Sequence, residues 1–254
     1  MALSWWIAVM VGLSLSLQEP QSRPAEPEPT SATGFLYKTV EFENETHAYC
    51  VYVPPEYTPQ KPWPVVLFLH GSGERGRDGF RQTDVGIARA IRRHRDWIPA
   101  VVVMPQCRPN TGWVGPMAEL ALRCVEQTSQ EYHLDPERVY LTGLSLGGAG
   151  VWYMGARLPG QFAALVPVCG FGDTEGAAKL ASVPIWCFHG SADKRVPVER
   201  SREMVAAIQA AGGNVTYTEY EGGSHNVWDR AFANPKFWQW LFAQRREPAR
   251  GASP

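Results

Sequence analysis

The sequence predicts a single α/β domain with a mostly parallel, eight-stranded sheet and helices on both faces of that sheet. From Phe35 onward, short apolar runs alternate with longer segments whose apolar residues recur at helical spacing. Several runs, such as "PVVLFLH" and "AVVVMP", are continuously apolar, which is typical of strands buried on both faces. Because no internal repeat and no second linker interrupts residues 35–246, we expect them to form one domain.

The individual elements follow from this alternation. Strands are expected at residues 38–42, 47–53, 65–70, 100–105, 139–144, 164–169, 185–189 and 215–220. Helices are expected at residues 84–95, 117–132, 146–158, 199–211 and 235–244. The first two strands lie close together in the chain and should pair antiparallel. The helix at 199–211 should stop at Gly212 and Gly213, since glycine is the preferred residue just past a helix end.

Charge is balanced over the 254 residues, with 24 Lys and Arg against 25 Asp and Glu and a net charge of −1. Such a balance provides no field that would attract nucleic acid or acidic membranes. The basic run at residues 92–96 is interpreted as the solvated face of a helix, since no aromatic side chains interleave with it. We therefore expect no nucleic-acid partner.

The first 34 residues differ in composition from the rest of the chain. Residues 1–17 are apolar and carry no charged side chain, which predicts a signal peptide or an N-terminal anchor. Residues 18–34 form a linker rich in Pro, Glu, Ser and Thr that we expect to be disordered, as we do the tail at 247–254. Export to the periplasm or medium is favoured; the alternatives are an uncleaved membrane anchor and a cytoplasmic protein.

The five cysteines have no spacing typical of a metal site, so we expect no metal and no other cofactor. Cys50, Cys169 and Cys187 lie in apolar, strand-like runs, where cysteine usually behaves as a small buried hydrophobe. In an exported chain one disulfide is expected, joining Cys107 to Cys124 or Cys169.

Ser145 is the candidate nucleophile. It lies in a Gly-x-Ser-x-Gly pattern between the predicted strand "RVYLTGL" and the helical segment "LGGAGVWYMGARL", which is the context of a nucleophile elbow. In so tight a turn, side chains two residues on either side would collide, which explains Gly143 and Gly147. A serine hydroxyl needs a histidine base oriented by a carboxylate, because it is a poor nucleophile at neutral pH.

Candidates for the base and the acid follow in the chain order expected for this architecture. His225 comes directly after the last predicted strand and is flanked by glycine and serine. Asp193 follows the preceding strand, with Asp173 and Glu175 as alternatives, whereas Asp229 lies on the wrong side of the histidine. The order Ser145, Asp193, His225 therefore predicts acyl-transfer chemistry.

Acyl transfer also needs donors for the oxyanion that forms in the transition state. The backbone N–H of Leu146, the residue after the nucleophile, is one candidate. The turn "LFLHGSGERG" after the third strand supplies the second from Ser72 or Gly73. The glycines do not indicate a phosphate-binding loop, because no Gly-Lys-Ser/Thr sequence follows them.

Together these motifs resemble the α/β-hydrolases, in particular the esterase branch with feruloyl and acetyl-xylan esterases, polyhydroxyalkanoate depolymerases and dienelactone-hydrolase-like proteins. The resemblance covers residues 52–246 and rests on "YVPPEY", "LFLHGSGERG", "VVMPQC", "DPERVYLTGLSLGG", "FHGSADKRVPV" and "YEGGSHNVW". It implies Ser145 as nucleophile, Asp193 as acid and His225 as base. Leu146 and Asn226 stand where similar proteins often have Met and Asp, and neither change removes a required side chain.

The resemblance implies a serine carboxylic ester hydrolase acting through an acyl-enzyme on feruloyl or acetyl esters of polysaccharides or on other bulky esters. About fifteen residues separate the predicted strands at 164–169 and 185–189, which leaves no room for a large lid. Trp113 and Trp228 are expected to line the resulting cleft and to bind substrate. The alternatives are a serine peptidase of the prolyl oligopeptidase type and a non-catalytic binding module tethered at the envelope.

Overall fold

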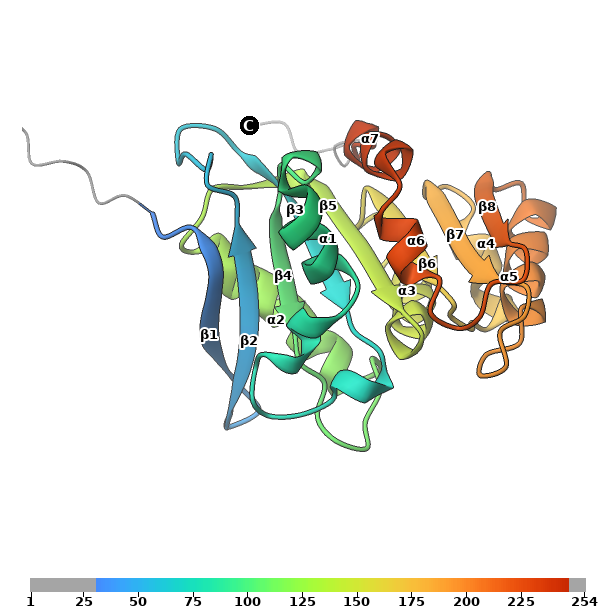
Figure 1. The fold of residues 1–254 in the computed structure, drawn as a ribbon, viewed down its shortest axis with the longest axis horizontal. Coiled ribbons are helices and arrows are strands. Elements are labelled where there is room, and N and C mark those ends of the chain that lie inside the picture. The colour runs from blue at the N-terminus through green and yellow to red at the C-terminus, as the bar shows by residue number, and fades with distance from the viewer. Residues whose placement is uncertain (1–30, 247–254) are drawn as a thin grey trace, which may run out of the picture. The chain divides into compact units, whose positions relative to one another are not determined.

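Eight strands form one sheet in the computed structural model, which describes residues 31–246 (Figure 1). They are β1 (Gly34–Phe42), β2 (Glu45–Val53), β3 (Trp63–Leu69), β4 (Val101–Pro105), β5 (Leu134–Leu144), β6 (Ala164–Val168), β7 (Ile185–Gly190) and β8 (Val215–Tyr220). The predicted signal peptide or anchor, most of the predicted linker and the tail lie outside the described residues.

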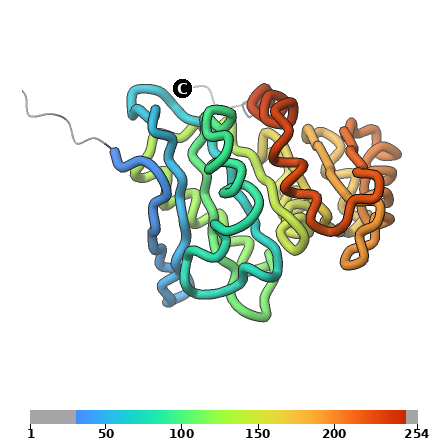
Figure 2. Tube along the Cα trace, in the orientation of Figure 1, coloured from blue at the N-terminus to red at the C-terminus, as the bar shows by residue number. Residues whose placement is uncertain are grey.

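The strand order is β1-β2-β4-β3-β5-β6-β7-β8, with β1 at one edge and β8 at the other (Figure 2). β1 pairs antiparallel with β2, and β2 antiparallel with β4, whereas all remaining pairs are parallel. The tight β1–β2 turn places Glu43 and Asn44 at positive φ, of 48° and 62°. The predicted mostly parallel sheet and its antiparallel first pair are thereby confirmed.

Helices cover both faces of the sheet, as predicted. They are α1 (Ile87–His94), α2 (Pro116–Ser129), α3 (Leu146–Arg157), α4 (Ala177–Leu180), α5 (Glu199–Ala210), α6 (Trp228–Phe232) and α7 (Pro235–Ala243). The apolar side chains of α2, α3, α4 and α5 pack in one core layer. Those of α1, α6 and α7 pack in the other, on the face toward the viewer in Figure 1.

The differences from the predicted elements have local causes. β1 begins four residues earlier than expected because Gly34 already pairs with Val53 of β2. α1 starts only at Ile87, since Gly86 has a φ of 56° and a short 3₁₀ turn precedes it. The helices α4 and α6 were not expected, because segments of four or five residues are too short to show a helical period.

Burial explains why the central strands form where they do. All seven residues of β3 are buried, as their continuously apolar sequence indicates. α1 buries Ile87, Ala88 and Ile91, and its last turn carries Arg92 and Arg93. The basic run therefore lies at the end of a surface helix.

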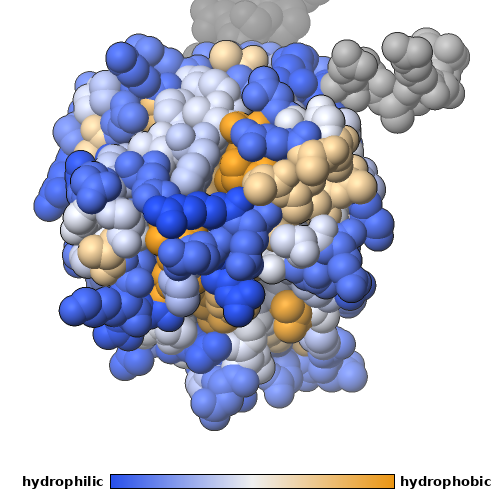
Figure 3. Space-filling model, turned by 90° about the vertical axis from the view of Figure 1, so that its right-hand side faces the viewer, coloured by the Kyte–Doolittle hydropathy of each residue, from blue (hydrophilic) through white to orange (hydrophobic). Residues whose placement is uncertain are grey.

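Hydrophilic side chains dominate the face of the molecule that carries the β8 edge (Figure 3), and such side chains discourage pairing with another strand.

All five cysteines are free and buried. The expected disulfide from Cys107 to Cys124 or Cys169 is therefore wrong. The Cys107 thiol instead lies 3.0 Å from the Thr111 hydroxyl, and Cys124 is buried on the sheet-facing side of α2. The interpretation of Cys50, Cys169 and Cys187 as buried residues is confirmed. Within residues 31–246, none of the helices combines the length and the apolar character needed to cross a membrane.

Candidate active site

The candidate residues gather at one edge of the sheet. Strands β3, β5, β6, β7 and β8 run parallel, so their carboxyl ends meet along the same side. Ser72 follows β3, Ser145 follows β5, Asp193 follows β7 and His225 follows β8. Residues distant in the chain are therefore brought together by the topology of the sheet.

Ser145 occupies a strained turn between β5 and α3. Its φ of 54° and ψ of −115° define a backbone conformation that residues other than glycine rarely adopt. A Cβ on Gly147 would lie 1.9 Å from the Leu69 carbonyl oxygen, and one on Gly143 would lie 2.5 Å from the Gly147 oxygen. The two glycines are thus required by close backbone contacts, as the sequence predicts. The turn is further fixed by the Ser145 amide, which donates to the Val168 carbonyl at 2.8 Å.

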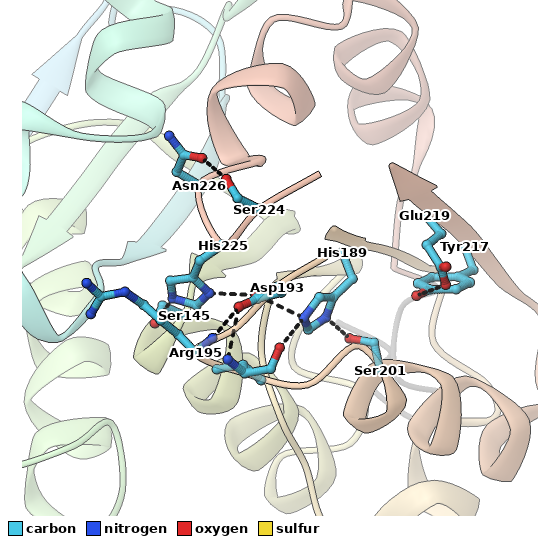
Figure 4. A network of polar contacts seen from close by, with 11 residues as sticks. Ser145, His189, Asp193, Arg195, Ser201, Tyr217, Glu219, Ser224, His225 and Asn226 are labelled. Carbon is cyan, nitrogen blue, oxygen red and sulfur yellow. Dashed lines mark hydrogen bonds and ion pairs between the residues drawn. The ribbon is translucent and has the colours of Figure 1, made fainter. Parts of the chain in front are cut away.

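Ser145, His225 and Asp193 form a continuous chain of hydrogen bonds (Figure 4). The distance from His225 Nε2 to Ser145 Oγ is 2.8 Å, and that from His225 Nδ1 to Asp193 Oδ2 is 2.6 Å. An ionised carboxylate only accepts hydrogen bonds, so Nδ1 carries a proton and Nε2 is left to accept from the serine hydroxyl. This arrangement has the geometry needed to withdraw a proton from Ser145.

The Asp193 carboxylate is buried but has several donors. Its side chain is inaccessible to solvent, and Oδ1 accepts from the Arg195 and Val196 amides at 2.8 and 3.0 Å. Burial acts to raise the pKa of Asp193, but the hydrogen bonds from His225 and from these two amides outweigh it and keep the pKa below its usual value. The carboxylate therefore stays ionised near neutral pH.

The other acidic candidates make different contacts. Asp173 and Glu175 are exposed, and the Asp173 side chain accepts from the Glu175 amide at 3.0 Å. Asp229 lies 3.4 Å from the guanidinium of Arg89. Of the four acids considered, Asp193 is the one that the structure hydrogen-bonds to His225.

The turn after β3 faces Ser145 across a cavity. Ser72 and Gly73 are exposed there in a 3₁₀ turn, and both line the cavity that contains Ser145. His70 anchors the start of the turn: its Nδ1 lies 2.6 Å from the Gly71 carbonyl, and its Nε2 accepts from the Cys107 amide at 2.9 Å. Burial lowers the pKa of His70 to about 4, so the ring is neutral and donates from Nδ1.

The first amide of α3 belongs to Leu146. At a helix start the N–H groups have no acceptor within the helix, and the positive end of the dipole favours negative charge. Leu146 and the Ser72 turn thus flank Ser145, where the sequence predicts an oxyanion hole.

The two predicted substrate-binding tryptophans have different positions. Trp228 lines the cavity beside Ser145, and its ring meets that of His225 edge-on with centroids 5.3 Å apart. Trp113, in contrast, is only 1% exposed and does not line that cavity. Its indole nitrogen donates to the His70 carbonyl at 2.9 Å. Trp113 lines a second cavity next to the elbow, and its indole supports the turn that carries Ser72. Its role in binding substrate stays a prediction.

Two cavities adjoin the elbow. The first, here called the Ser145 cavity, has a volume of about 770 Å³ and includes Ser72, Ser145, Arg195, His225 and Trp228 in its lining. The second, called the α3 cavity, has a volume of about 690 Å³ and includes Trp113, Leu146, Ala149, Tyr153 and Phe171. Ser145 lines the first cavity and Leu146, the next residue, lines the α3 cavity, so both cavities reach the elbow.

Comparison with known proteins agrees with the fold. The sequence profile of the phospholipase/carboxylesterase family matches residues 118–236. A solved structure described as a thermostable esterase shares 34% sequence identity with a TM-score of 0.77, over 84% of this chain and 63% of the other. The chain has the α/β-hydrolase fold, and its residues 118–236 match the phospholipase/carboxylesterase family.

Other similar proteins resemble this α/β-hydrolase over different lengths. A bifunctional acetylxylan esterase/xylanase of Neocallimastix patriciarum is 28% identical over 155 residues, which are 56% of this chain and 21% of that protein. The chain thus spans about a fifth of the length of this curated relative. The feruloyl esterase module from Clostridium thermocellum, solved as a variant with sinapinate, has a TM-score of 0.64 at 18% identity, over 91% of this chain and 97% of the other.

One group of side chains in this hydrolase has the composition of a metal site. Within residues 31–246, Cys169, His189 and Asp193 offer ligand atoms that lie within 4.8 Å of one another, and all three are buried. Burial raises the pKa of the Cys169 thiol, which favours its protonated form. Both ring nitrogens of His189 and both oxygens of Asp193 already have hydrogen-bonding partners. His189 and Asp193 therefore belong to a hydrogen-bonded cluster, and Cys169 is buried beside it.

His189 and Ser201 are contacts of the site that the sequence analysis does not anticipate. The pair "HG" at the end of a predicted strand indicates a residue that braces a turn, and nothing in the local sequence of Ser201 distinguishes it from other helical serines. The one available signal is spacing, because His189 is the penultimate residue of β7 and lies four residues before Asp193.

Proposed function

We propose that this α/β-hydrolase is a serine carboxylic ester hydrolase that acts through an acyl-enzyme. The observation that carries the proposal is the hydrogen-bond chain from Ser145 through His225 to Asp193, with distances of 2.8 and 2.6 Å. Ser145 Oγ attacks the ester carbonyl while its proton passes to His225 Nε2, and Asp193 stabilises the imidazolium that forms. The match of residues 118–236 to the phospholipase/carboxylesterase family supports the same chemistry.

In this proposal the tetrahedral intermediate collapses when its bond to the alcohol oxygen breaks. His225 returns the proton to that oxygen, and the alcohol leaves. Water then attacks the acyl-enzyme by the same route, its proton passing to His225 and then to Ser145 Oγ as the acid is released. The amides of Leu146 and of Ser72 or Gly73 hold the oxyanion; removing one such donor typically costs about 10²- to 10³-fold in rate.

We infer from the route of the proton which cavity holds the alcohol half of the ester and which cavity holds the acyl half. The leaving oxygen must reach His225 Nε2, so the alcohol half belongs in the Ser145 cavity, beside Trp228. The oxyanion on the reacting carbon points toward the amides of Leu146 and the Ser72 turn. The acyl substituent on that carbon then extends along α3 into the α3 cavity.

The α3 cavity suits a large aromatic or apolar acyl group. Phe171 and Val114, which line it, are 47% and 51% exposed, whereas large apolar side chains are mostly buried elsewhere in residues 31–246. Tyr153 adds an aromatic ring at the same wall. Only a 3₁₀ turn and the four-residue α4 separate β6 from β7, so this segment provides no large lid over the site. We therefore propose feruloyl or other bulky esters, with acetyl esters of polysaccharides as smaller substrates.

Similar proteins support this substrate class without deciding it. The names of a curated relative and of several solved structures include acetylxylan and feruloyl esterases. Acylaminoacyl peptidases share the fold at 12–14% identity, and this chain spans less than half of them. A peptidase of the prolyl oligopeptidase type is the alternative, and a non-catalytic module tethered at the envelope is a third.

Hydrolysis by matched proteins separates these functions. The native protein should hydrolyse methyl ferulate and p-nitrophenyl acetate but not an N-acylated amino acid anilide, and Ser145→Ala should lose both ester activities. A protein that cleaves the anilide preferentially is a peptidase, and one that hydrolyses none of the three is a binding module. Ester hydrolysis that persists in Ser145→Ala contradicts the assignment of the nucleophile.

We also propose that the protein is exported, with residues 1–17 as signal peptide or anchor. The uncharged apolar run and the Pro-rich segment after it support this proposal. Fractionation of cells that express the full chain tests it: the esterase should appear outside the cytoplasm, and activity confined to the cytoplasmic fraction contradicts export.

A further inference from the structure

A second histidine contacts the carboxylate that orients His225. His189, at the end of β7, is inaccessible to solvent, and its Nε2 lies 3.2 Å from Asp193 Oδ2. This is the same oxygen that receives the Nδ1 proton of His225 at 2.6 Å (Figure 4). Asp193 therefore lies between two imidazole rings, only one of which contacts Ser145.

The contacts of His189 determine which of its nitrogens carries the proton. Nε2 also lies 3.0 Å from the Val196 carbonyl oxygen, which only accepts hydrogen bonds. Both of its neighbours are acceptors, so Nε2 must be the protonated nitrogen. Burial lowers the pKa of His189, which keeps the ring neutral and leaves Nδ1 as an acceptor.

Ser201 satisfies that acceptor from the opposite side of the ring. It is fully buried on α5, and its Oγ lies 2.7 Å from His189 Nδ1. Since Nδ1 has no proton, the serine hydroxyl donates. Ser201 thus donates to His189, and His189 Nε2–H donates to the Val196 carbonyl while lying 3.2 Å from the Oδ2 that accepts the proton of His225.

The other titratable groups around His189 do not replace this contact. The ligating atoms of Cys169 and Asp193 lie within 4.8 Å of those of His189, but the thiol is protonated, because burial raises its pKa. The Glu219 carboxylate on β8 is paired with Arg202 at 2.6 Å, and the Tyr217 hydroxyl donates to it at 2.9 Å. The Asp193 carboxylate is therefore the ionised group that faces the protonated nitrogen of His189.

We propose that His189 and Ser201 are positioning residues that fix the orientation of the Asp193 carboxylate and moderate its attraction for the His225 imidazolium. The inference rests on the esterase function proposed above. Two backbone amides hold Oδ1, whereas His225 Nδ1 at 2.6 Å and His189 Nε2 at 3.2 Å are the side-chain nitrogens that contact Oδ2 among the contacts described for residues 31–246. Without His189, Oδ2 keeps only His225 as a side-chain neighbour, and its negative charge is stabilised by one polar contact fewer.

Substitution of His189 by residues that remove or keep the donor tests this proposal. His189→Leu should lower kcat for p-nitrophenyl acetate by about 10- to 100-fold with little change in KM, because it removes the polar nitrogen that lies 3.2 Å from the buried, ionised carboxylate. The acid-side midpoint of the kcat/KM profile should move to higher pH by about half a unit or more, since a less shared carboxylate stabilises the imidazolium better. The Nε2 of a glutamine lies at a similar distance along the side chain as the Nε2 of histidine. His189→Gln should therefore restore most of kcat and most of the native pH midpoint.

Further variants serve as controls. Ser201→Ala should shift the profile in the same direction by a smaller amount, and it carries the test if His189→Leu does not fold. His94→Leu, on α1, should leave rate and profile unchanged. An unchanged pH profile in both His189→Leu and Ser201→Ala, or a Gln variant no better than Leu, overturns the proposal. Parallel assays of Ser145→Ala distinguish failure of the His189 proposal from failure of the proposed esterase mechanism, because activity in that variant contradicts the mechanism itself.

Discussion

His225 Nε2 lies 2.8 Å from Oγ of Ser145, a residue 80 positions earlier in the chain. Parallel pairing makes this contact possible, because β5 and β8 end at the same side of the sheet with β6 and β7 between them. In the proposed mechanism, the loops after four strands supply the nucleophile, the acid, the base and the oxyanion turn.

Replacing the carboxylate of Asp193 by an amide should abolish most of the activity. Asp193→Asn keeps the shape of the side chain but no longer holds His225 with its proton on Nδ1. A loss of about 10⁴-fold in kcat is typical of this change in a Ser-His-Asp triad. Steady-state kinetics with p-nitrophenyl acetate measure it. Asp173→Asn, which alters the exposed alternative acid, should leave kcat within about twofold of the native value; the reverse ranking of the two variants contradicts the assignment.

The strained backbone conformation at Ser145 should lower the free energy of unfolding. A residue with a Cβ is strained at a φ of 54° and a ψ of −115°, whereas glycine adopts this conformation more readily. Ser145→Gly should therefore be more stable than Ser145→Ala by about 1 kcal/mol or more in urea unfolding, although both variants are inactive. If the alanine variant is as stable as the glycine variant, the turn stores no strain.

Stability should fall as the solution becomes acidic, in part through His70. Burial lowers its pKa in the folded protein to about 4, below the unfolded value near 6.5, so the unfolded chain binds the proton more readily. The contribution of His70 is complete above about pH 6.5 and should decrease by up to roughly 3 kcal/mol as pH falls toward 4.

Urea unfolding at several pH values measures this dependence. His70→Asn, which retains a donor for the Gly71 carbonyl, should show a flatter dependence of the unfolding free energy between pH 6.5 and 4. His133→Asn, at an exposed histidine, should follow the native curve. Equal slopes in the His70 variant and the native protein contradict the buried, neutral state of this ring.

Filling the α3 cavity should discriminate against large acyl groups. Ala149 is half-buried on α3 and lines that cavity. Ala149→Phe should lower kcat/KM for methyl ferulate by about 10- to 100-fold relative to methyl acetate, which keeps the alcohol the same. Ala192→Phe, in the Ser145 cavity, should leave this ratio unchanged. If the ratio changes in Ala192→Phe instead, the acyl group lies on the other side of the elbow.

The fold and the reacting groups could be predicted because their signals are local or follow chain order. Continuous apolar runs identify buried strands, as in β3, and a tight turn demands small residues, as at Gly143 and Gly147. The ends of parallel strands meet at one edge, so Asp193 and His225 could be selected by their place after β7 and β8.

Other features depend on distances that the sequence does not contain. Trp113 follows a strand end, but its side chain turns into the core against Gly150, where a Cβ would lie 2.4 Å from that of the tryptophan. Expected export of the chain indicated a disulfide, but the sequence says nothing of the separation between thiols. His189 meets Ser201 only because α5 packs on the sheet beside β7.

The central claim is that Ser145 carries the acyl group during turnover. Acid quenching during hydrolysis of p-nitrophenyl acetate, followed by digestion and mass spectrometry, measures this directly. We predict one acetyl group on the peptide that contains Ser145, formed in the native protein and absent from Ser145→Ala. Undiminished turnover by Ser145→Ala, with the acetyl group on another residue or on none, would contradict the account.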